Sequence, residues 1–463
     1  MVLSNHKKSI DETIFDQVEM FSTNKTKSYS FRLAQINKMY GALKKNEDKL
    51  LTALYKDLKK SRGEAYVSEL GVVYKEISLV KSNLKKWMKS KKVSTPIVAF
   101  PSRSKIFYEP LGSVLIIGPW NYPLQLLLVP LVGAIAAGNC VVLKPSEYAP
   151  HTSQAIIDIL TDIFPPSFLS IFQGGIDVST QLLEKKFDHI FFTGSSAVGK
   201  VVAQKAAQNL TPTTLELGGK SPCIITSSAK LEVSVKRIIF GKFLNMGQTC
   251  IAPDYIYIDK SIKEEFLTKL KIEMEKTFGQ SPIRCKHLGR IVNEKNFLRL
   301  QKFLKKDQIF LGGDASLGDL FIAPTILNKV RWSDEVMQEE IFGPILPVLE
   351  YQDLNSAINQ LKTMDKPLAL YVFSEDQKEQ NKVLNSLSFG GGCINDTLIH
   401  VANYNLPFGG IGKSGHGSYH GKQSFYTFSH KKSISITSSK LDLALRYPPY
   451  SDFKEKVLRF FFK

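Results

Sequence analysis

Cysteine is scarce in this sequence, and the few cysteines present argue against a disulfide-bonded secreted fold. There are five, an odd number, and they are widely spaced with no Cys-x-x-Cys pair. Secreted disulfide frameworks and zinc sites carry cysteines at closer, repeated spacings. The opening residues 1–8 are also not followed by the apolar stretch of a secretory signal. We therefore expect a cytoplasmic chain in a reducing compartment, without a metal site.

A long uninterrupted apolar run is also missing. Residues 111–143 carry no formal charge, but prolines and glycines interrupt them, so we expect strand, loop, helix and strand instead of a membrane span. After Tyr450 only 13 residues remain, fewer than the ~20 that a bilayer span needs. The sequence thus predicts no transmembrane anchor. Its basic, aromatic end, 458–463, either touches anionic lipid weakly or packs against a partner subunit.

Acidic residues are outnumbered by basic ones, 43 to 61, and the formal net charge is +18. Such a charge raises the question of nucleic-acid or membrane partners. The lysines are scattered through every segment, however, with no basic helix carrying interleaved aromatics and no zinc-finger spacing. We expect a solvated lysine-rich surface and no nucleic-acid binding. With 463 residues, 43% hydrophobic and 22% charged, the chain should form two or three globular domains.

Neither common nucleotide-binding motif is present. The spacing Gly194-x-x-x-x-Gly199 differs from the dinucleotide G-x-G-x-x-G, and Val201 follows Lys200 where a phosphate-binding P-loop needs Ser or Thr. A nucleoside triphosphatase is therefore disfavoured. The glycine pair nevertheless follows an apolar strand and opens a helix, so the backbone amides and the helix dipole suit a phosphate group.

What the sequence does contain is a thiol in an unusual setting. Cys250 lies in the stretch 245–254, Asn-Met-Gly-Gln-Thr-Cys-Ile-Ala-Pro-Asp. Gly247 permits a tight turn and a close approach of the backbone to a ligand. A buried structural cysteine usually lies inside an apolar run. Cys250 is therefore a candidate nucleophile, with a structural role as the alternative.

Two polar residues lie at or just after the ends of apolar strands and accompany this thiol. Glu216 ends an apolar strand before a Gly-Gly turn, where burial would raise its pKa toward a value useful to a base. The alternative is an ion pair with Lys220. Asn121 lies in the proline-bounded turn 119–123, where its amide can donate to an oxyanion or can serve the turn alone.

The order of predicted elements indicates an α/β fold. Residues 30–87 have a helical period, and short apolar strands then alternate with helical stretches over 114–217 and again over 223–395. Parallel sheets of this kind bind ligands at the carboxyl ends of their strands. Four candidate site residues fall at those ends: Asn121, Lys144, Gly194 and Glu216.

These pieces together resemble the aldehyde dehydrogenase superfamily, most of all its class 3 branch of fatty-aldehyde and bacterial members. Further stretches look like family motifs in the family's order: Lys144-Pro145-Ser146-Glu147, 192–199, 339–344 and 406–412. The resemblance covers nearly the whole chain. It implies two Rossmann-like parallel-sheet domains and a small β element. The implied bounds are a dinucleotide-binding domain over 1–88 and 110–217, a catalytic domain over 218–418, a bridging element over 89–109 and 419–445, and a tail over 446–463.

The bridging element has support in the residues themselves. Apolar runs at 97–100 and 105–108 surround a proline-containing stretch and predict a hairpin, and the alternation over 433–437 predicts a further strand. In the resembled family such a hairpin and strand join two subunits. The resemblance therefore implies a homodimer.

The resemblance also implies an NAD(P) site, with NAD preferred and NADP usable. Family residues matching Lys144 and Glu147 lie near the adenosine ribose, and the one matching Glu340 lies near the nicotinamide ribose. From the residues alone, Lys144 reads equally as a surface lysine, Glu147 as a helix N-terminal charge and Phe342 as a core residue. The full implied set is Trp120, Lys144, Glu147, Thr193, Gly194, Ser195, Gly199, Leu217, Glu340 and Phe342.

The expected chemistry is oxidation of an aldehyde to a carboxylic acid. Cys250 would attack the carbonyl carbon, and the Asn121 amide and the Cys250 backbone N–H would hold the oxyanion. Hydride would pass to NAD(P), and Glu216 would activate water to hydrolyse the resulting thioester. A non-enzymatic protein on the same fold would be marked by loss of Cys250 or Glu216, and both are present.

A cysteine hydrolase or thioester-forming acyltransferase is the rival enzyme. It would use the same thiol without a nucleotide and would need a base such as histidine beside it. Of the eight histidines, only three lie near the last family-like motif, 406–412, and the end of the chain. These three are expected to be structural or at the surface: His416, His420 and His430.

Overall fold

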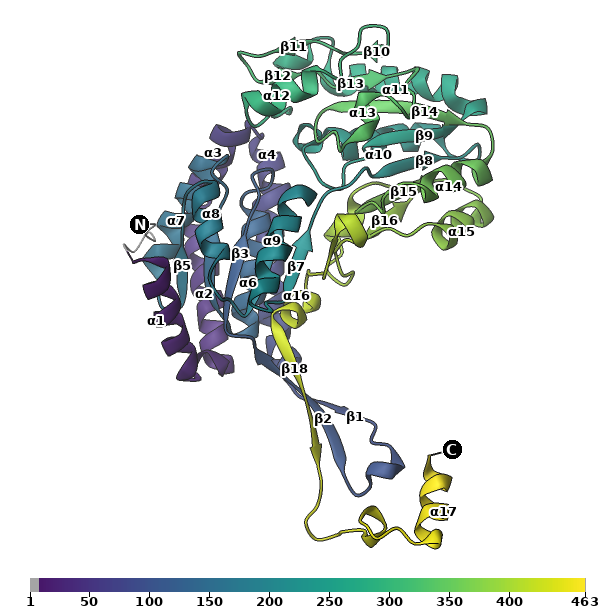
Figure 1. Cartoon of the computed structure of the whole chain (residues 1–463). Coiled ribbons are helices and arrows are strands. Elements are labelled where there is room, and N and C mark those ends of the chain that lie inside the picture. Colours follow the sequence, from purple (N-terminus) through teal and green to yellow (C-terminus); the bar gives the residue numbers. More distant parts are fainter. Residues whose placement is uncertain (1–7, 463) are drawn as a thin grey trace.

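The computed structural model describes residues 8–462, which form two α/β bodies and a thin projecting arm (Figure 1). Residues 1–7, most of the opening stretch that is not followed by a secretory apolar region, lie outside the described residues. The two bodies are built on sheets of six and seven strands, both largely parallel. The predicted α/β class with two parallel-sheet bodies is confirmed.

The first body opens with helices, as the period over 30–87 predicts. These are α1 (Ile10–Ser22), α2 (Tyr29–Lys45), α3 (Glu47–Leu58), α4 (Arg62–Ala65) and α5 (Gly71–Trp87). On α3 the residues Leu50, Leu54 and Leu58 are fully buried at the expected spacing. A π-helical turn, Tyr66–Leu70, joins α4 to α5. Such turns insert one extra residue per turn and often occur at functional sites.

The sheet of the first body has the order β17-β7-β6-β3-β4-β5, with β17 antiparallel at one edge. Its strands are β3 (Ser113–Ile117), β4 (Cys140–Lys144), β5 (Leu169–Ile171), β6 (His189–Thr193), β7 (Thr213–Glu216) and β17 (Gly415–His416). The strands β3, β4 and β6 are buried along their whole length, which explains their continuous apolar runs.

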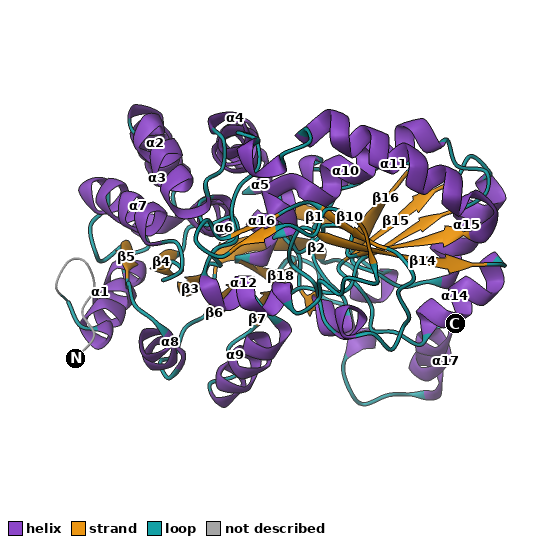
Figure 2. Ribbon diagram, turned by 90° about the horizontal axis from the view of Figure 1, so that it is seen from above, coloured by secondary structure: helices purple, strands orange, loops and turns teal. Residues whose placement is uncertain are grey.

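Helices cover both faces of this sheet (Figure 2). One face packs against α2, α5 and two further helices, α6 (Gln125–Ala137) and α7 (Pro150–Ile163). The other packs against α1, α8 (Ile176–Leu183) and α9 (Ser196–Gln208). The stretch considered as a membrane span is thus β3, α6 and β4, and α6 is apolar all round because it is buried on every side.

The sheet of the second body has the order β10-β13-β14-β9-β8-β15-β16, with β10 antiparallel to β13. Its strands are β8 (Pro222–Ile225), β9 (Tyr255–Asp259), β10 (Ile309–Leu311), β13 (Thr325–Leu327), β14 (Ile345–Tyr351), β15 (Ala369–Phe373) and β16 (Gly391–Ile394). A separate pair, β11 (Ala315–Ser316) and β12 (Phe321–Ile322), lies beside it.

Alternate residues of these strands face two different helix layers. One layer holds α10 (Leu231–Phe243) and α11 (Lys263–Phe278). The other holds α12 (Glu294–Gln301), α13 (Glu335–Gln338), α14 (Leu354–Lys362) and α15 (Gln377–Ser386). Ile256 and Ile258 pack into the first layer, whereas Tyr255 and Tyr257 pack into the second, as the period of two along a strand requires.

The arm is a three-stranded sheet in the order β1-β2-β18. It consists of β1 (Lys91–Val93), β2 (Arg103–Pro110) and β18 (Ser429–Ile436), followed by α17 (Asp452–Phe461) at the end of the chain, while α16 (Lys422–Thr427) packs back on α6. The strand predicted over 433–437 is confirmed as the end of β18, which pairs with β2 along eight residues.

The predicted hairpin strand at 97–100 is wrong. Ile97–Ala99 forms a short 3-10 turn. The first strand of the hairpin is Lys91–Val93, which lies in the lysine-rich segment 89–96 and pairs with Ser104–Ile106. Pro96 and Pro101 flank the apolar run, and a proline has no N–H to donate to a strand ladder. The apolar residues of this run are instead largely exposed, with Ile97 at 68%.

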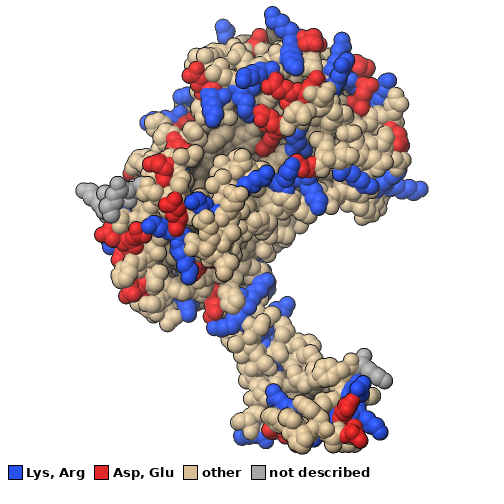
Figure 3. Space-filling model, viewed as in Figure 1, with Lys and Arg blue, Asp and Glu red and all other residues tan. Residues whose placement is uncertain are grey.

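Basic side chains are distributed over both bodies and the arm on the face shown in Figure 3, with acidic residues among them. The scattered lysines of the sequence therefore stay scattered in three dimensions on this face. In residues 8–462 no helix has the length and apolar character that crossing a membrane requires.

Candidate active site

A cavity of about 400 Å³ lies where the two bodies meet. Both Cys250 and Glu216 line it, together with Thr193 and Leu217. The remaining lining is mostly apolar and comes from α5, α6, α10 and the segment 398–408. It includes Val72, Leu126, Val129, Phe240, Leu244 and Val401. The structure therefore brings the predicted nucleophile and the predicted base to one apolar space.

The loop that carries Cys250 has a strained backbone. Asn245 and Met246 both have positive φ, 52° and 56°, in a region that non-glycine residues seldom occupy. Gly247 follows at φ 70°, and a side chain there would meet the Gly343 carbonyl oxygen at 2.2 Å. The Asn245 N–H donates to Glu64 Oε1 at 2.7 Å, which helps to hold this turn. The surrounding structure thus holds the loop that carries Cys250 in one backbone conformation.

The surroundings of Cys250 favour its neutral thiol. Burial raises the pKa of this thiol, and the carboxylates of Glu340 and Glu216 raise it further. The backbone N–H groups of Cys250 and Ile251 approach the sulfur and act in the opposite direction, as hydrogen bonds to a thiolate do. Its partial burial on the cavity wall differs from the sealed core position of Cys223. A nearby proton acceptor is required for attack.

Glu216 is buried at the end of β7 with no partner for either carboxylate oxygen among the described residues. Burial raises its pKa well above the ordinary value, as an unpaired carboxyl in an apolar setting should. The alternative in which Lys220 neutralises Glu216 is wrong. Lys220 Nζ lies 2.7 Å from Asp254 Oδ2 and donates also to the carbonyls of Val336 and Glu339.

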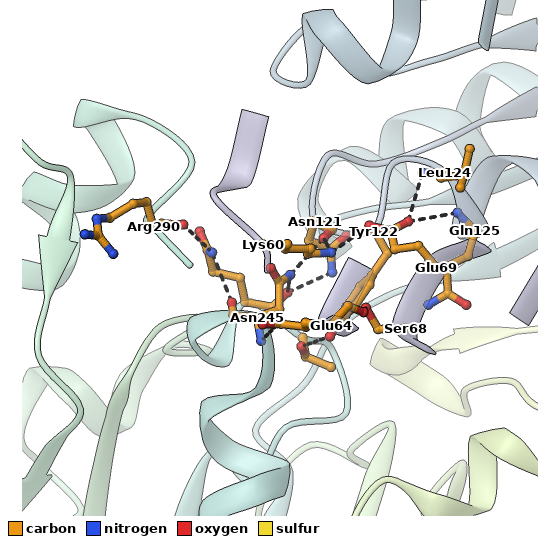
Figure 4. Close-up of polar contacts among 12 residues, drawn as sticks. Lys60, Glu64, Ser68, Glu69, Asn121, Tyr122, Leu124, Gln125, Asn245 and Arg290 are labelled. Atoms are coloured by element: carbon orange, nitrogen blue, oxygen red, sulfur yellow. Dashed lines mark hydrogen bonds and ion pairs between the residues drawn. The ribbon is translucent and has the colours of Figure 1, made fainter. Parts of the chain in front are cut away.

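Asn121 lies directly beside the nucleophile loop (Figure 4). Its side-chain Nδ2 donates to the Gln248 carbonyl at 3.0 Å, and its own backbone carbonyl accepts from Asn245 Nδ2 at 2.8 Å. An amide nitrogen carries two hydrogens, so this bond leaves one of them unused. Asn121 is buried and is not itself among the residues that line the cavity, although its neighbour Tyr122 is. Asn121 thus does more than close its own turn, because it ties that turn to the loop of Cys250.

The loop from β6 into α9 offers a cradle for a phosphate. Ser195 caps α9, and the Oγ1 of Thr193 is buried without a partner among residues 8–462. A side chain at Gly199 would meet the Leu217 methyl at 2.6 Å, so glycine is needed for α9 to approach β7. A helix N-terminus with unmet donors, at the carboxyl end of a parallel sheet, fits a dinucleotide.

Lys144 and Glu147 form an ion pair at the end of β4, which is separated from β6 by β3. Lys144 ends β4 and is only 3% exposed, so the alternative of a surface lysine is wrong. Its Nζ lies 2.6 Å from Glu147 Oε2, and the Glu147 side chain is partly exposed. The helix that follows, α7, begins at Pro150 and has no acidic residue in its first turn. Glu147 therefore faces Lys144 and does not enter that turn.

Three further predicted cofactor residues, Trp120, Glu340 and Phe342, come from the turn after β3 and from the segment 339–344. Glu340 approaches the turn after β7 so closely that a side chain at Gly218 would meet its Oε2 at 1.9 Å. Burial, then Asp254, raises the pKa of Glu340 to about 8. Phe342 has φ 50° and meets Trp120 edge to face, with ring centroids 5.3 Å apart. This partly buried aromatic pair lies outside the main apolar clusters, which disfavours a simple core role for Phe342.

Sequence reasoning missed Lys242. It is fully buried on α10, its Nζ has no hydrogen-bond partner in the described part of the chain, and burial lowers its pKa to about 8. Asp254 and Glu340 lie close enough to influence it. The only signal in the sequence is a lysine inside an apolar helical stretch, and the abundance of lysine conceals it.

The histidines expected at the surface or in a structural role near the closing motifs include one that reaches the cavity. His420 is buried, lines the cavity, stacks on Phe408, and burial lowers its pKa to about 4. Within residues 8–462 no histidine is hydrogen-bonded to Cys250, and no group of three or more potential ligands is arranged for a metal ion. Cys250 therefore lacks the histidine partner of a cysteine hydrolase. The Cys–His contact among the described residues joins Cys393 Sγ to His400 Nδ1 at 3.4 Å, and neither of these residues lines the cavity.

Comparison with known proteins agrees with this chemistry. The profile of the aldehyde dehydrogenase family matches residues 2–434. The 4,4'-diaponeurosporen-aldehyde dehydrogenase of Staphylococcus aureus is 46% identical over 98% of this chain and 99% of its own. The mouse aldehyde dehydrogenase family 3 member B1 is 44% identical, with 97% of each chain covered.

Solved structures give the same result. A substrate-bound Staphylococcus aureus AldH has a TM-score of 0.97 at 46% identity, covering 98% of this chain and 100% of the other. A Staphylococcus aureus betaine aldehyde dehydrogenase solved with NAD+ is 26% identical, with a TM-score of 0.84 over 96% of this chain and 92% of the other. A Methanocaldococcus jannaschii glyceraldehyde-3-phosphate dehydrogenase solved with NADP is also 26% identical, with a TM-score of 0.83 over 95% of this chain and 96% of the other. The family match over nearly the whole chain, together with the thiol, the carboxylate and the phosphate cradle, shows that this protein belongs to the aldehyde dehydrogenase family and is an NAD(P)-dependent oxidoreductase acting on aldehydes.

Proposed function

We propose that Cys250 is the nucleophile of this oxidation, that Asn121 and the Cys250 backbone N–H hold the oxyanion, and that Glu216 is the base for hydrolysis. The observation that carries the proposal is the shared cavity, which the thiol and an unpartnered carboxylate both line. Because the pKa of the thiol is raised, it must give its proton to a base, and Glu216 has both oxygens free to take it.

The sulfur then adds to the aldehyde carbon and leaves negative charge on its oxygen, where the N–H donors stabilise it. NAD(P), when bound, accepts the hydride that this carbon loses. A thioester of Cys250 remains. Glu216 removes a proton from water, the water oxygen adds to the thioester carbon, and the carboxylic acid leaves as the sulfur is released.

The cofactor residues proposed are Trp120, Lys144, Glu147, Thr193, Gly194, Ser195, Gly199, Leu217, Glu340 and Phe342. Lys144 and Glu147 would hold the adenosine ribose, and the start of α9 would hold a phosphate. The buried and unpartnered Thr193 Oγ1 supports this assignment. We propose the dinucleotide-binding domain as 1–88 and 110–217, the catalytic domain as 218–418, the bridging element as 89–109 and 419–445, and the tail as 446–463.

We infer that the substrate is an apolar aldehyde, because most side chains that line the cavity beyond Cys250 are apolar. Each additional buried methylene contributes ~0.8 kcal/mol, so kcat/KM should rise roughly threefold to fourfold per methylene until the cavity is full. A series of straight-chain aldehydes, followed by NADH absorbance, measures this slope. A flat series, or a preference for a charged semialdehyde, would contradict an apolar substrate.

We expect NAD to be preferred over NADP, because the place proposed for Glu147 beside the adenosine ribose would bring its carboxylate close to a 2′-phosphate. In Glu147→Gln we expect the NADP to NAD ratio of kcat/KM to rise several-fold, on the order of 1 kcal/mol of relieved repulsion at a partly solvated site. Loss of its partner also leaves Lys144 free to meet the phosphate. Steady-state kinetics with both nucleotides give the ratio.

The matched control for this change is Glu184→Gln, which removes an exposed carboxylate that faces Lys205 on the surface. Its nucleotide ratio should equal that of the unmodified enzyme. If Glu147→Gln leaves the ratio unchanged and lowers only the melting temperature, Glu147 stabilises the fold and does not choose the nucleotide.

A homodimer formed through the arm is also proposed. β18 has one free edge, and seven of its eight residues are exposed, including Ile434 and Ile436. An exposed strand edge can pair with a strand of another chain. Sedimentation analysis should give a dimer, and a monomer at micromolar concentration would contradict it. We further propose a cytoplasmic location, which quantitative recovery in a salt-washed membrane pellet would exclude.

A further inference from the structure

A buried ion pair lies immediately behind the turn that carries Asn121 (Figure 4). Lys60 follows α3 and Glu69 lies in the π-helical turn, and both side chains are fully buried. Lys60 Nζ is 2.6 Å from Glu69 Oε1. Neither residue is among those that line the cavity.

Each member of the pair bonds to one side of the turn. Lys60 Nζ donates to the Asn121 carbonyl at 2.9 Å and lies 3.9 Å from the centre of the Tyr122 ring. Glu69 Oε2 accepts the backbone N–H groups of Leu124 and Gln125, both at 3.0 Å. Since α6 begins at Gln125, the carboxylate also meets the positive end of this helix. The pair thus holds the turn at its start and at its end.

The same turn is bonded to the loop of Cys250. Asn245 Nδ2 donates to the same Asn121 carbonyl that Lys60 holds, and Asn121 Nδ2 donates to the Gln248 carbonyl. Tyr122 Oη lies 2.7 Å from Thr249 Oγ1, the residue before the nucleophile. Three contacts therefore join the turn of Asn121 to the loop of Cys250. The Lys60–Glu69 pair supports the turn that makes all three.

Removing two charges from water costs several kcal/mol per ion, so a buried pair is weak evidence for stability. An apolar pair would fill the same space, but it could not bond the Asn121 carbonyl or the two amides of α6. We propose that Lys60 and Glu69 are positioning residues of the oxyanion site, holding the Asn121 amide in the orientation that meets the developing charge. This inference rests on the proposed oxyanion role of Asn121.

The test uses Lys60→Met/Glu69→Gln in the full-length enzyme. This double variant removes both charges together, and the side-chain carbonyl oxygen of the introduced glutamine still accepts from the two amides. The probe is p-nitrophenyl acetate without nucleotide: the Cys250 sulfur bonds to the acyl carbon, p-nitrophenolate leaves and the thiol proton passes to a base. Misplacing the donor should slow this acylation burst by roughly 10- to 100-fold, with Kd for NAD within about twofold.

A double-mutant cycle with Asn121→Ala separates positioning from a purely structural role. Without the Asn121 amide, the change at Lys60 and Glu69 should slow the burst by no more than about threefold. Equal slowing in both backgrounds, or none in either, would overturn the inference. If Asn121→Ala itself leaves the burst unchanged, the proposed oxyanion role fails first.

Lys263→Met/Glu350→Gln is the control, because it removes a less buried ion pair between the start of α11 and β14, and neither residue lines the cavity. It should change the melting temperature and leave the burst rate unaltered. Should the double variant at the turn fail to fold, Glu69→Gln alone keeps the acceptor oxygen while removing one charge. A burst rate equal to that of the unmodified enzyme in folded Glu69→Gln would also overturn the inference.

Discussion

In Cys250→Ala, aldehyde oxidation should fall by at least about 1000-fold while NAD binding stays within about twofold. The thiol makes the covalent bond that turns the flat carbonyl carbon tetrahedral, and without it hydride has no favourable path to leave. The proposed nucleotide residues lie elsewhere, at the ends of β4 and β6 and at the start of α9. NADH absorbance measures the first quantity, and quenching of tryptophan fluorescence measures the second.

Cys285→Ala is the appropriate control, because Cys285 is a second partly exposed thiol that does not line the cavity. It should retain full activity. Residual oxidation by Cys250→Ala within about tenfold of the unmodified enzyme would refute the assignment of the nucleophile, since loss of a covalent step costs far more than that.

Glu216→Gln should separate the two halves of the reaction. Loss of a general base typically slows its step by ~10²–10⁴, so steady turnover should fall by roughly that factor. Formation of the thioester should survive in part, which predicts a burst of about one NADH per active site followed by slow release. Rapid-mixing absorbance resolves the burst from the steady phase. Unchanged hydride transfer and hydrolysis would make Glu216 a structural residue.

The same variant should change the response to pH. Burial raises the pKa of Glu216, so its carboxyl holds a proton at low pH and cannot act as a base. Hydrolysis by the unmodified enzyme should therefore rise as the pH increases through that raised pKa. In Glu216→Gln this rise should disappear, because the amide does not titrate in that range. A persisting rise would assign it to another group.

Much of the fold was predictable from local pattern. The buried strands β3, β4 and β6 are continuous apolar runs, and strand and helix alternate, so the parallel sheets could be foreseen. Parallel strands end at one edge of a sheet, and the alternation alone predicts that Asn121, Lys144, Gly194 and Glu216 lie along that edge. The unusual polar setting of Cys250 marked the nucleophile candidate.

Partners that lie far apart in the sequence could not be predicted. Lys220 pairs with Asp254 instead of Glu216, and Lys60 reaches Asn121 from 61 positions away. The arm also differs from the prediction. The apolar run bounded by Pro96 and Pro101 forms a turn, and the basic segment Lys91–Val93 forms the strand. Which ion pairs form, and which segment becomes the strand, depend on the side chains that meet once the chain has packed.

The sequence by itself determined the α/β class, the strands and the residues at their ends, because a period of hydrophobicity reports which face of an element is buried. Only the tertiary structure decided that Lys60 and Lys242 are buried, among 61 lysines and arginines that are otherwise mostly solvated. A lysine has the same local signature in water and in a protein interior. What distinguishes the two is the desolvated surroundings of the ammonium group, and these exist only once distant segments have packed around it.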